Sequence, residues 1–157
     1  IDVLSDRSIP LADGPIFEAR LTWDEKGDDA AVDTVFGLAN ASHTTDADSI
    51  TESVFFSNNG GDTAINCESD DGTTEVNATD STVVLVEDTS QLFWIDSRDP
   101  DDCHLYIDCV EVLASTTFDI SAATGPMKAL VLTEKSAGAH VPSILLDFMR
   151  LRSTDLS

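Results

Sequence analysis

The chain has 157 residues, of which 41% are hydrophobic, so it can bury the core of one domain and is not a disordered tail. Thirty Asp and Glu against eight Lys and Arg give a net charge of −22, and the acids are spread through nearly every segment. The lack of clustered cations argues against direct nucleic-acid binding. The sequence contains no apolar run of about 18 residues, so no membrane span is predicted. The stretch that begins at Ile1 shows no signal-peptide pattern.

The acidic composition predicts a protein that works in concentrated salt. Self-repulsion at this charge density destabilises a compact state at low ionic strength. In about 1 M salt the Debye length falls to about 3 Å, and most of that penalty disappears. The Asp-rich, lysine-poor composition resembles that of haloarchaeal proteins. An ordinary acidic extracellular or capsid protein is the alternative.

In chain order, residues 1–14 carry turn signals and predict an extended arm or an entry strand. Apolar and polar residues then alternate over Ile16–Trp23, which predicts an amphipathic strand. Val35–Ala39 is almost entirely apolar and predicts a strand buried on both faces. The polar residues 40–53 predict a loop that has room for a short helix.

Later segments predict further short strands, because β-branched and apolar residues are bounded by Gly, Asn and Asp turn signals. These segments are Val54–Phe56, Ala64–Glu68, Thr73–Asn77, Thr82–Val86, Lys128–Glu134 and Ser143–Arg152. Thr116–Ile120 predicts either a strand or an extended connection.

The stretch Gln91–Leu113 has the clearest pattern in the chain. It predicts a strand, an Asp/Pro turn, a second strand, a tight turn at Asp108-Cys109 and a third strand. Glycine is preferred where a turn needs positive φ, so Cys109 predicts either another kind of turn or local strain. Trp94 has the opposite parity to Phe93 and is expected to face a groove or a partner, whereas the other aromatic residues predict core packing.

These patterns predict the fold class: all-β, with a two-sheet sandwich of roughly eleven to thirteen short strands. No repeat, linker or shift in composition divides the chain. We expect an N-terminal arm at residues 1–14 and a single β-sandwich domain at residues 15–157.

The three cysteines, Cys67, Cys103 and Cys109, form neither a disulfide framework nor a CxxC zinc motif. On one extended segment Cys103 and Cys109 would lie about 20 Å apart, whereas a disulfide needs Cα atoms within about 7 Å. We therefore expect buried free thiols, with a bond from Cys67 to one of the others as the alternative.

Two strands of this stretch, FWID at Phe93–Asp96 and LYID at Leu105–Asp108, resemble the concanavalin A-like (laminin-G/glucanase-like) sandwiches. In those families a tyrosine–apolar–Asp–Gly hairpin ends the second strand, and here Cys109 replaces the glycine. Ile16–Trp23 resembles the opening strand of the family, and Leu145–Leu151 resembles its closing strand. The resemblance implies a lectin-like, two-sheet antiparallel jelly-roll sandwich of the concanavalin A-like type over about residues 15–152.

The runs IFEARLTW, ESDDGTTEV and LLDFMRLR also look like parts of structural proteins encoded by tailed viruses. Such proteins are lectin-like sandwiches without catalytic residues, used as capsid decoration, turret or fibre modules. The resemblance implies a virion protein, and a haloarchaeal virus would account for the acidity.

No catalytic residue is expected. Glucanases of the resembled fold place three acids on one strand as Glu-x-Asp-x-x-Glu. Here Glu18 is alone on its strand, and Glu111 follows Asp108 without a third acid. Glycoside hydrolysis needs two carboxylates about 5–10 Å apart. Three histidines show no spacing typical of a nucleophile–base pair or a zinc site: His43, His104 and His140.

No metal ligand and no cofactor is assigned from the sequence. Calcium is the one ion that the loops could hold, because hard cations take clustered carboxylates. The candidate turns contain Asp99, Asp101 and Asp102, or Asp70 and Asp71, and neither turn matches the EF-hand pattern.

The sequence therefore predicts a non-enzymatic virion structural protein at the capsid surface, or otherwise an extracellular protein. We expect it to decorate or stabilise a capsid through a sandwich face and the arm at residues 1–14. Its partners would be the major capsid protein, other virion proteins and further copies of itself. The alternative is a lectin-like module that binds cell-surface glycans.

Overall fold

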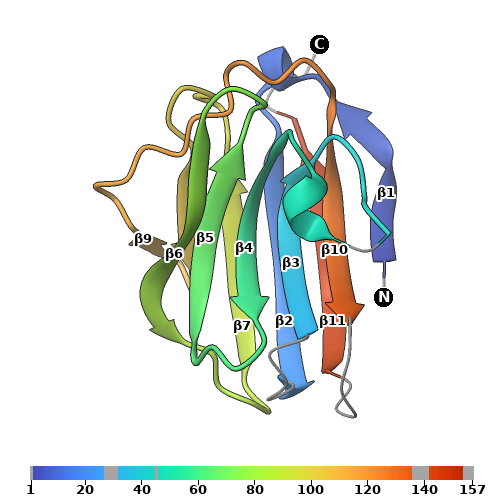
Figure 1. Ribbon diagram of the computed structural model, residues 1–157, viewed down its shortest axis with the longest axis vertical. Coiled ribbons are helices and arrows are strands. Elements are labelled where there is room, and N and C mark those ends of the chain that lie inside the picture. The colour runs from blue at the N-terminus through green and yellow to red at the C-terminus, as the bar shows by residue number, and fades with distance from the viewer. Residues whose placement is uncertain (1, 27–31, 45, 136–141, 154–157) are drawn as a thin grey trace.

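The computed structural model describes residues 2–26, 32–44, 46–135 and 142–153 of the chain. Within these ranges eleven strands form two antiparallel sheets that pack face to face (Figure 1). Sheet A has the order β1 (Asp2–Ile9), β10 (Met127–Lys135), β3 (Val32–Ala39), β4 (Ser53–Asn59), β5 (Ala64–Asp70) and β6 (Glu75–Val84). Sheet B has the order β11 (Ser143–Arg152), β2 (Ile16–Glu25), β7 (Ser90–Asp96), β8 (His104–Ile107) and β9 (Val110–Val112).

Most of the strands predicted from the sequence are confirmed, and β3 is buried over nearly its whole length. One difference is instructive. The predicted strands Thr73–Asn77 and Thr82–Val86 are one continuous strand, β6, whose pairing with β5 is irregular. Thr116–Ile120, predicted as a strand or an extended connection, is a connection that Phe118 joins to Cys103 by an isolated bridge.

The segment predicted to be an arm contains strand β1 and the short 3-10 helix η1 (Leu11–Asp13). Strand β1 pairs antiparallel with β10, so it is the edge strand of sheet A. Hydrogen bonds on one side of this segment are therefore made within the chain itself.

An aromatic cluster fills the space between the sheets. Trp23 and Phe93 come from sheet B, and Phe36 and Phe56 come from sheet A; all four are fully buried. The rings of Phe36 and Phe93 meet edge to face with centroids 4.6 Å apart, a favourable geometry for aromatic pairs. The alternation along each strand places these residues on the inner face.

Gly37 of β3 lets the sheets approach closely at the centre of this core. A Cβ atom at this position would overlap the carbonyl oxygen of Val54 and lie 2.8 Å from Cδ1 of Ile95 in the opposite sheet. Both neighbours belong to ordered strands, so a side chain at residue 37 has no room.

The hairpin between β8 and β9 is a two-residue turn in which both central residues have positive φ, +50° at Asp108 and +66° at Cys109. This is the pattern of a type I′ turn, for which Asn-Gly and Asp-Gly are preferred. Asp108 also fixes the hairpin to β7, since it donates its N–H to the Leu92 carbonyl at 2.8 Å and accepts the Leu92 N–H at 2.9 Å. Cys109 therefore occupies a turn position that favours glycine, which is the strained alternative expected from the sequence.

All three cysteines are free. Cys67 and Cys103 are buried in the core, as predicted, whereas Cys109 is exposed. Burial raises the pKa of the Cys67 thiol to about 12, so this side chain behaves as a small apolar group. In the described part of the chain, no helix has the length and apolar character needed to cross a membrane.

Candidate functional site

Residues 40–44 and 46–52 cross the outer face of sheet A, and we call this segment the strap. It contains the short 3-10 helix η2 (Ala47–Ser49), which lies in front of the sheet in Figure 1. Ala47 and Ile50 of the strap are buried against a second apolar cluster on this outer face, formed by Val35, Ala39, Phe55, Leu130 and Leu132. The strap therefore covers the apolar half of the face and leaves the polar half open.

Hydrogen bonds fix the strap at both ends of this contact. The Ala47 N–H donates to Oε2 of Glu134 on β10 at 3.0 Å. The carboxylate of Glu52 accepts the N–H groups of Thr124 and Gly125, each at 2.9 Å, and the side-chain amide of Asn40 at 2.9 Å. Burial alone would raise the pKa of Glu52, but these donors hold the pKa below its usual range.

Carboxylates line a hollow of about 110 Å³ on one side of η2. Glu134 of β10 lies directly opposite Asp33 of β3, and Asp33 lies opposite Asn59 of β4. Directly opposed residues have Cβ atoms about 5 Å apart, and like charges in that position are destabilising. Asp46 and Asp48 of the strap complete the lining.

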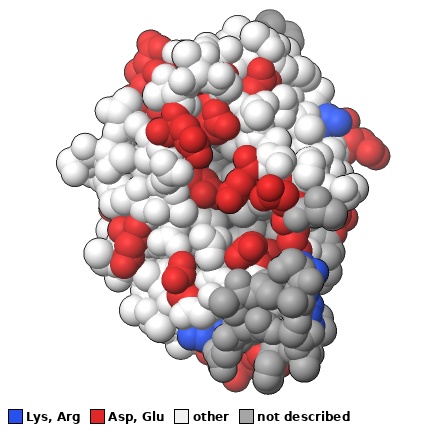
Figure 2. All heavy atoms as spheres, in the orientation of Figure 1, with Lys and Arg blue, Asp and Glu red and all other residues white. Residues whose placement is uncertain are grey.

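A second hollow lies on the other side of η2. It is lined by Asp48 again, by Glu68 and Asp70 of β5, and by Glu75 of β6. Within the part of the chain that the structure describes, no Lys or Arg lines either hollow. Figure 2 shows the acidic side chains gathered across the middle of this face. We call the two hollows together, with Asp33, Asp46, Asp48, Glu68 and Glu134 as their principal residues, the acidic hollow.

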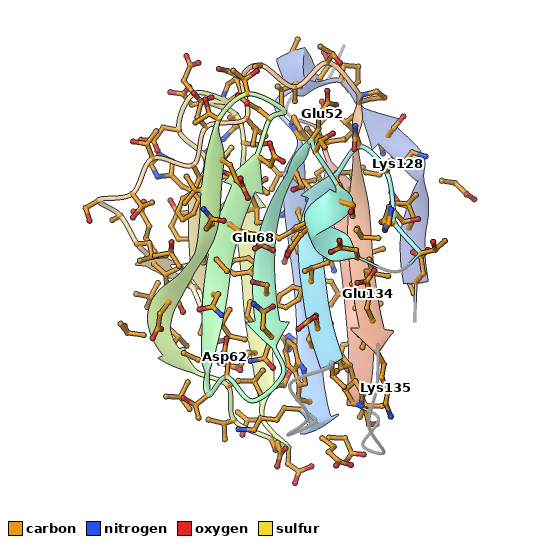
Figure 3. The ribbon with its side chains drawn as sticks, viewed as in Figure 1. Glu52, Asp62, Glu68, Lys128, Glu134 and Lys135 are labelled. Carbon is orange, nitrogen blue, oxygen red and sulfur yellow. The ribbon has the colours of Figure 1, made fainter. Side chains whose placement is uncertain are left out.

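Burial and mutual repulsion shape the electrostatics of the acidic hollow. Burial, followed by the charges of Asp48 and Glu75, raises the pKa of Glu68 to about 7. Burial also raises the pKa values of Asp33 and Glu134. Figure 3 shows Glu68 and Glu134 on the same face of sheet A, from strands β5 and β10.

The acidic hollow has hydrogen-bonding capacity that the described residues leave unused. Oε1 of Glu134 is buried and makes no hydrogen bond within the described part of the chain. An ionised carboxylate offers about four acceptor positions and no donor. Chemically, the arrangement suits a ligand that presents several donors, such as adjacent hydroxyl groups or an ammonium group.

The turns considered for calcium use their carboxylates on their own backbone. Asp71 accepts the N–H groups of Thr73 and Thr74 at 2.8 and 2.6 Å, and Asp70 accepts that of Gly72 at 2.7 Å. Asp99 likewise accepts the N–H of Asp101 at 3.2 Å. Across the residues that the structure describes, no group of three or more His, Cys, Asp or Glu side chains is arranged to hold a metal ion.

The other residues weighed from the sequence are distributed over separate regions. His43 accepts the N–H of Asp46 at 3.0 Å, and His104 pairs with Glu111 through Nδ1 and Oε1 at 2.7 Å. His140 lies outside the described residues. Glu18 forms an ion pair with Arg152 at 2.6 Å. The structure thus does not bring a histidine together with a cysteine or serine nucleophile among these residues.

The acidic hollow itself was missed by sequence reasoning. Its members come from β3, β5, β10 and the strap, and only the fold brings them together. One local signal existed, because Asp33 and Glu134 occupy outward positions of apolar strands where the alternation exposes one face.

Among known proteins, similarity to this chain is found only with solved structures. No protein-family model and no curated protein matches the sequence. The chain is similar to the carbohydrate-binding module CBM66 from Bacillus subtilis, with a TM-score of 0.60 and 10% identity over 97% of this chain and 81% of that one. It is also similar to the potassium-bound carbohydrate recognition domain of Emp46p, with a TM-score of 0.62 and 11% identity over 96% of this chain and 76% of that one.

An enzyme appears among the similar structures as well. The alginate lyase PA1167 from Pseudomonas aeruginosa matches with a TM-score of 0.59 and 15% identity, over 94% of this chain and 68% of that one. At these identities the likeness concerns the fold alone. The comparisons do not support the capsid or haloarchaeal interpretation, which stays a prediction. They confirm the predicted fold: the chain is an all-β, two-sheet antiparallel jelly-roll sandwich of the concanavalin A-like type.

Proposed function

We propose that the protein is a non-enzymatic carbohydrate-binding module and that the acidic hollow is its binding site. The observation that carries the proposal is a recessed surface lined by carboxylates with free acceptor positions, on one face of a sandwich. Ligand sites are concave and use a few well-placed polar groups for orientation. The fold is shared with carbohydrate-binding modules and recognition domains, which supports the proposal by analogy only.

The charge of the acidic hollow selects a chemical class of glycan. Carboxylates accept hydrogen bonds from sugar hydroxyls, and such charge-assisted bonds are about twice as strong as neutral ones. Neutral sugars and amino sugars therefore suit the site, since an ammonium group would add a Coulombic attraction. Uronic acids and sialic acids would place a further negative charge beside Asp33, Asp48 and Glu134 and are expected to be excluded.

The same charge distinguishes the proposed module from a lyase. Alginate is a polymer of uronic acids, and its cleavage by elimination needs groups that neutralise the uronate and remove a proton. Among the described residues that line the two hollows, none is Arg, Lys, His or Tyr. A binding role therefore fits these residues better than catalysis on an acidic polysaccharide.

A glycan array probed in 1 M KCl, with and without a chelator, tests the proposal directly. We expect binding to neutral or amino-sugar glycans that does not depend on the chelator. The double substitution Asp48→Asn and Glu134→Gln should then weaken the best ligand at least tenfold in a calorimetric titration, because charged hydrogen bonds contribute about 1.5–3 kcal/mol each.

Asp101→Asn is the matched control. Asp101 lies in the exposed turn after β7, outside the lining of either hollow, and its substitution also removes a negative charge. It should leave the affinity unchanged. Absence of any glycan binding, or equal affinity in the double variant and the wild type, would refute the proposal.

A further inference from the structure

The outer face of sheet B differs in composition from the rest of the molecule. Seven of the ten aromatic side chains are buried. The remaining three, Trp94, Tyr106 and Phe148, are half-buried. They come from β7, β8 and β11, and pairing with outward-facing neighbours places all three on this face. We call this surface, with its charged neighbours, the aromatic face.

Arginines are concentrated on the same face of an otherwise acidic protein. Arg150 and Arg152 of β11 and Arg20 of β2 project from it, and the first two are more than half exposed. The guanidinium groups of Arg20 and Arg150 lie 5.9 and 4.5 Å from the ring centroid of Phe148. Tyr, Trp, Phe and Arg are the residues enriched in protein–protein interfaces.

The charges on this face are ordered along one cross-strand row. In register, Arg150 of β11 is opposite Glu18 of β2, which is opposite Trp94 of β7. Trp94 is opposite Tyr106 of β8, which is opposite Glu111 of β9. The row therefore runs across all five strands with a cation at one end, an anion at the other, and stacked aromatic rings 5.0 Å apart between them.

We propose that the aromatic face is a self-association surface whose occupant is a second copy of this chain. A two-fold axis in the plane of the face, parallel to the strands and passing Trp94, reverses the row of the second copy. Arg150 of each copy then faces Glu111 of the other, and Trp94 meets Trp94. A two-fold interface requires such a self-complementary surface, and a row with opposite charges at its two ends provides it.

Charge also argues for this face over the remainder of the surface. Two copies, each with a net charge of −22, repel one another over most relative orientations. On the aromatic face, Arg20, Arg150 and Arg152 offset the charges of Glu18 and Glu111, so contact there costs less than contact on the acidic sheet A. The proposal does not depend on glycan binding, which uses the opposite sheet.

Charge reversal tests the predicted contact. Sedimentation velocity in 1 M KCl, at chain concentrations from 10 µM to 1 mM, should show a monomer–dimer equilibrium. Glu111→Arg alone and Arg150→Glu alone should each weaken association at least tenfold, since like charges then face each other across the interface. The double variant should recover the wild-type dissociation constant to within about threefold.

The rescue is specific because of the geometry within one chain. Arg150 and Glu111 stand four strands apart, about 19 Å at the usual strand spacing. A pair restored by the double variant must therefore form between copies. Asp6→Arg on β1 reverses an exposed acid of sheet A that lies outside the lining of both hollows, and it serves as the control, with no effect expected on this equilibrium.

Three results would overturn the proposal. The first is a chain that stays monomeric up to 1 mM in 1 M KCl. The second is a dimer whose affinity is unchanged by either single reversal or is not recovered by the double one. The third is a monomer that binds heparin through these arginines, which would assign the face to an anionic polymer instead. Circular dichroism of each variant confirms that the fold is retained.

Discussion

At the scale of single residues, Glu68 carries the largest pH dependence in the acidic hollow. Burial and nearby acids raise its pKa from 4.5 to about 7 in the folded chain. A raised carboxyl pKa means that the folded state binds the proton more tightly than the unfolded state. The ionised Glu68 carboxylate therefore destabilises the folded chain, and this destabilisation is complete above about pH 7. It disappears as the pH falls from about 7 towards 4.5, because the carboxylate is protonated in the folded state.

Glu68→Gln should remove this penalty. We expect the free energy of unfolding at pH 8 to rise by about 2 kcal/mol, allowing for solvent screening at a half-buried site. At pH 4.5 the substitution should have little effect, and urea unfolding at both pH values measures the difference. Glu87→Gln, an exposed acid on the loop before β7, is the control. A carboxyl carbon resonance of Glu68 that titrates near pH 4.5 would contradict the prediction.

At the scale of elements, the strap is held against sheet A by a few charged contacts, and Glu52 joins it to residues more than 70 positions later in the chain. Glu52→Ala should lower the free energy of unfolding by about 2 kcal/mol, because four donors lose a half-buried carboxylate. Hydrogen exchange should accelerate at the Thr124 and Gly125 amides.

Glu87→Ala is the matched control for this change, since its carboxylate accepts only an exposed N–H, that of Lys26 at 3.1 Å, among the bonds that the structure shows. Equal urea midpoints for the two variants would show that Glu52 does not clamp the strap.

The strands were predictable from the sequence because their signals are local. Alternation identified β2, β7, β8 and β11, and the parity of Trp94 against Phe93 correctly predicted its outward orientation. The join of two predicted strands into β6 was not visible, because residues 78–81 between them (Ala-Thr-Asp-Ser) show no alternation of apolar and polar residues.

The candidate site was not predictable in the same way. Asp33 and Glu134 are about one hundred residues apart, and only the pairing of β3 with β10 brings them opposite each other. In the cluster that is visible in the sequence at Asp99, Asp101 and Asp102, Asp99 accepts the backbone N–H groups of the other two residues within the same turn. Acids that are neighbours in the sequence therefore lie in turns, whereas the acids of the hollow become neighbours only when the strands pair.

At the scale of the whole molecule, the net charge of −22 and the opposed acids of sheet A have a common consequence, which is a dependence of stability on salt. Opposed side chains about 5 Å apart interact well within the Debye length of about 10 Å at 0.1 M, but beyond the about 3 Å that applies at 1 M. We therefore expect the thermal unfolding midpoint at pH 8 to rise by at least 10 °C between 0.1 and 2 M KCl. About 1 kcal/mol moves the midpoint by about 2–4 °C in domains of 150–250 residues, so this rise corresponds to about 2.5–5 kcal/mol.

Neutralising the acids of the hollow separates charge repulsion from other effects of salt. The combined substitutions Asp33→Asn, Asp48→Asn, Glu68→Gln and Glu134→Gln should reduce the salt dependence and raise the midpoint mainly at 0.1 M. Four matched substitutions of exposed acids elsewhere should have a smaller effect, because those acids lie farther from like charges. A midpoint that is the same at 0.1 and 2 M KCl would favour the ordinary acidic protein over one that works in concentrated salt. An unchanged salt slope in the fourfold variant would place the repulsion outside the acidic hollow.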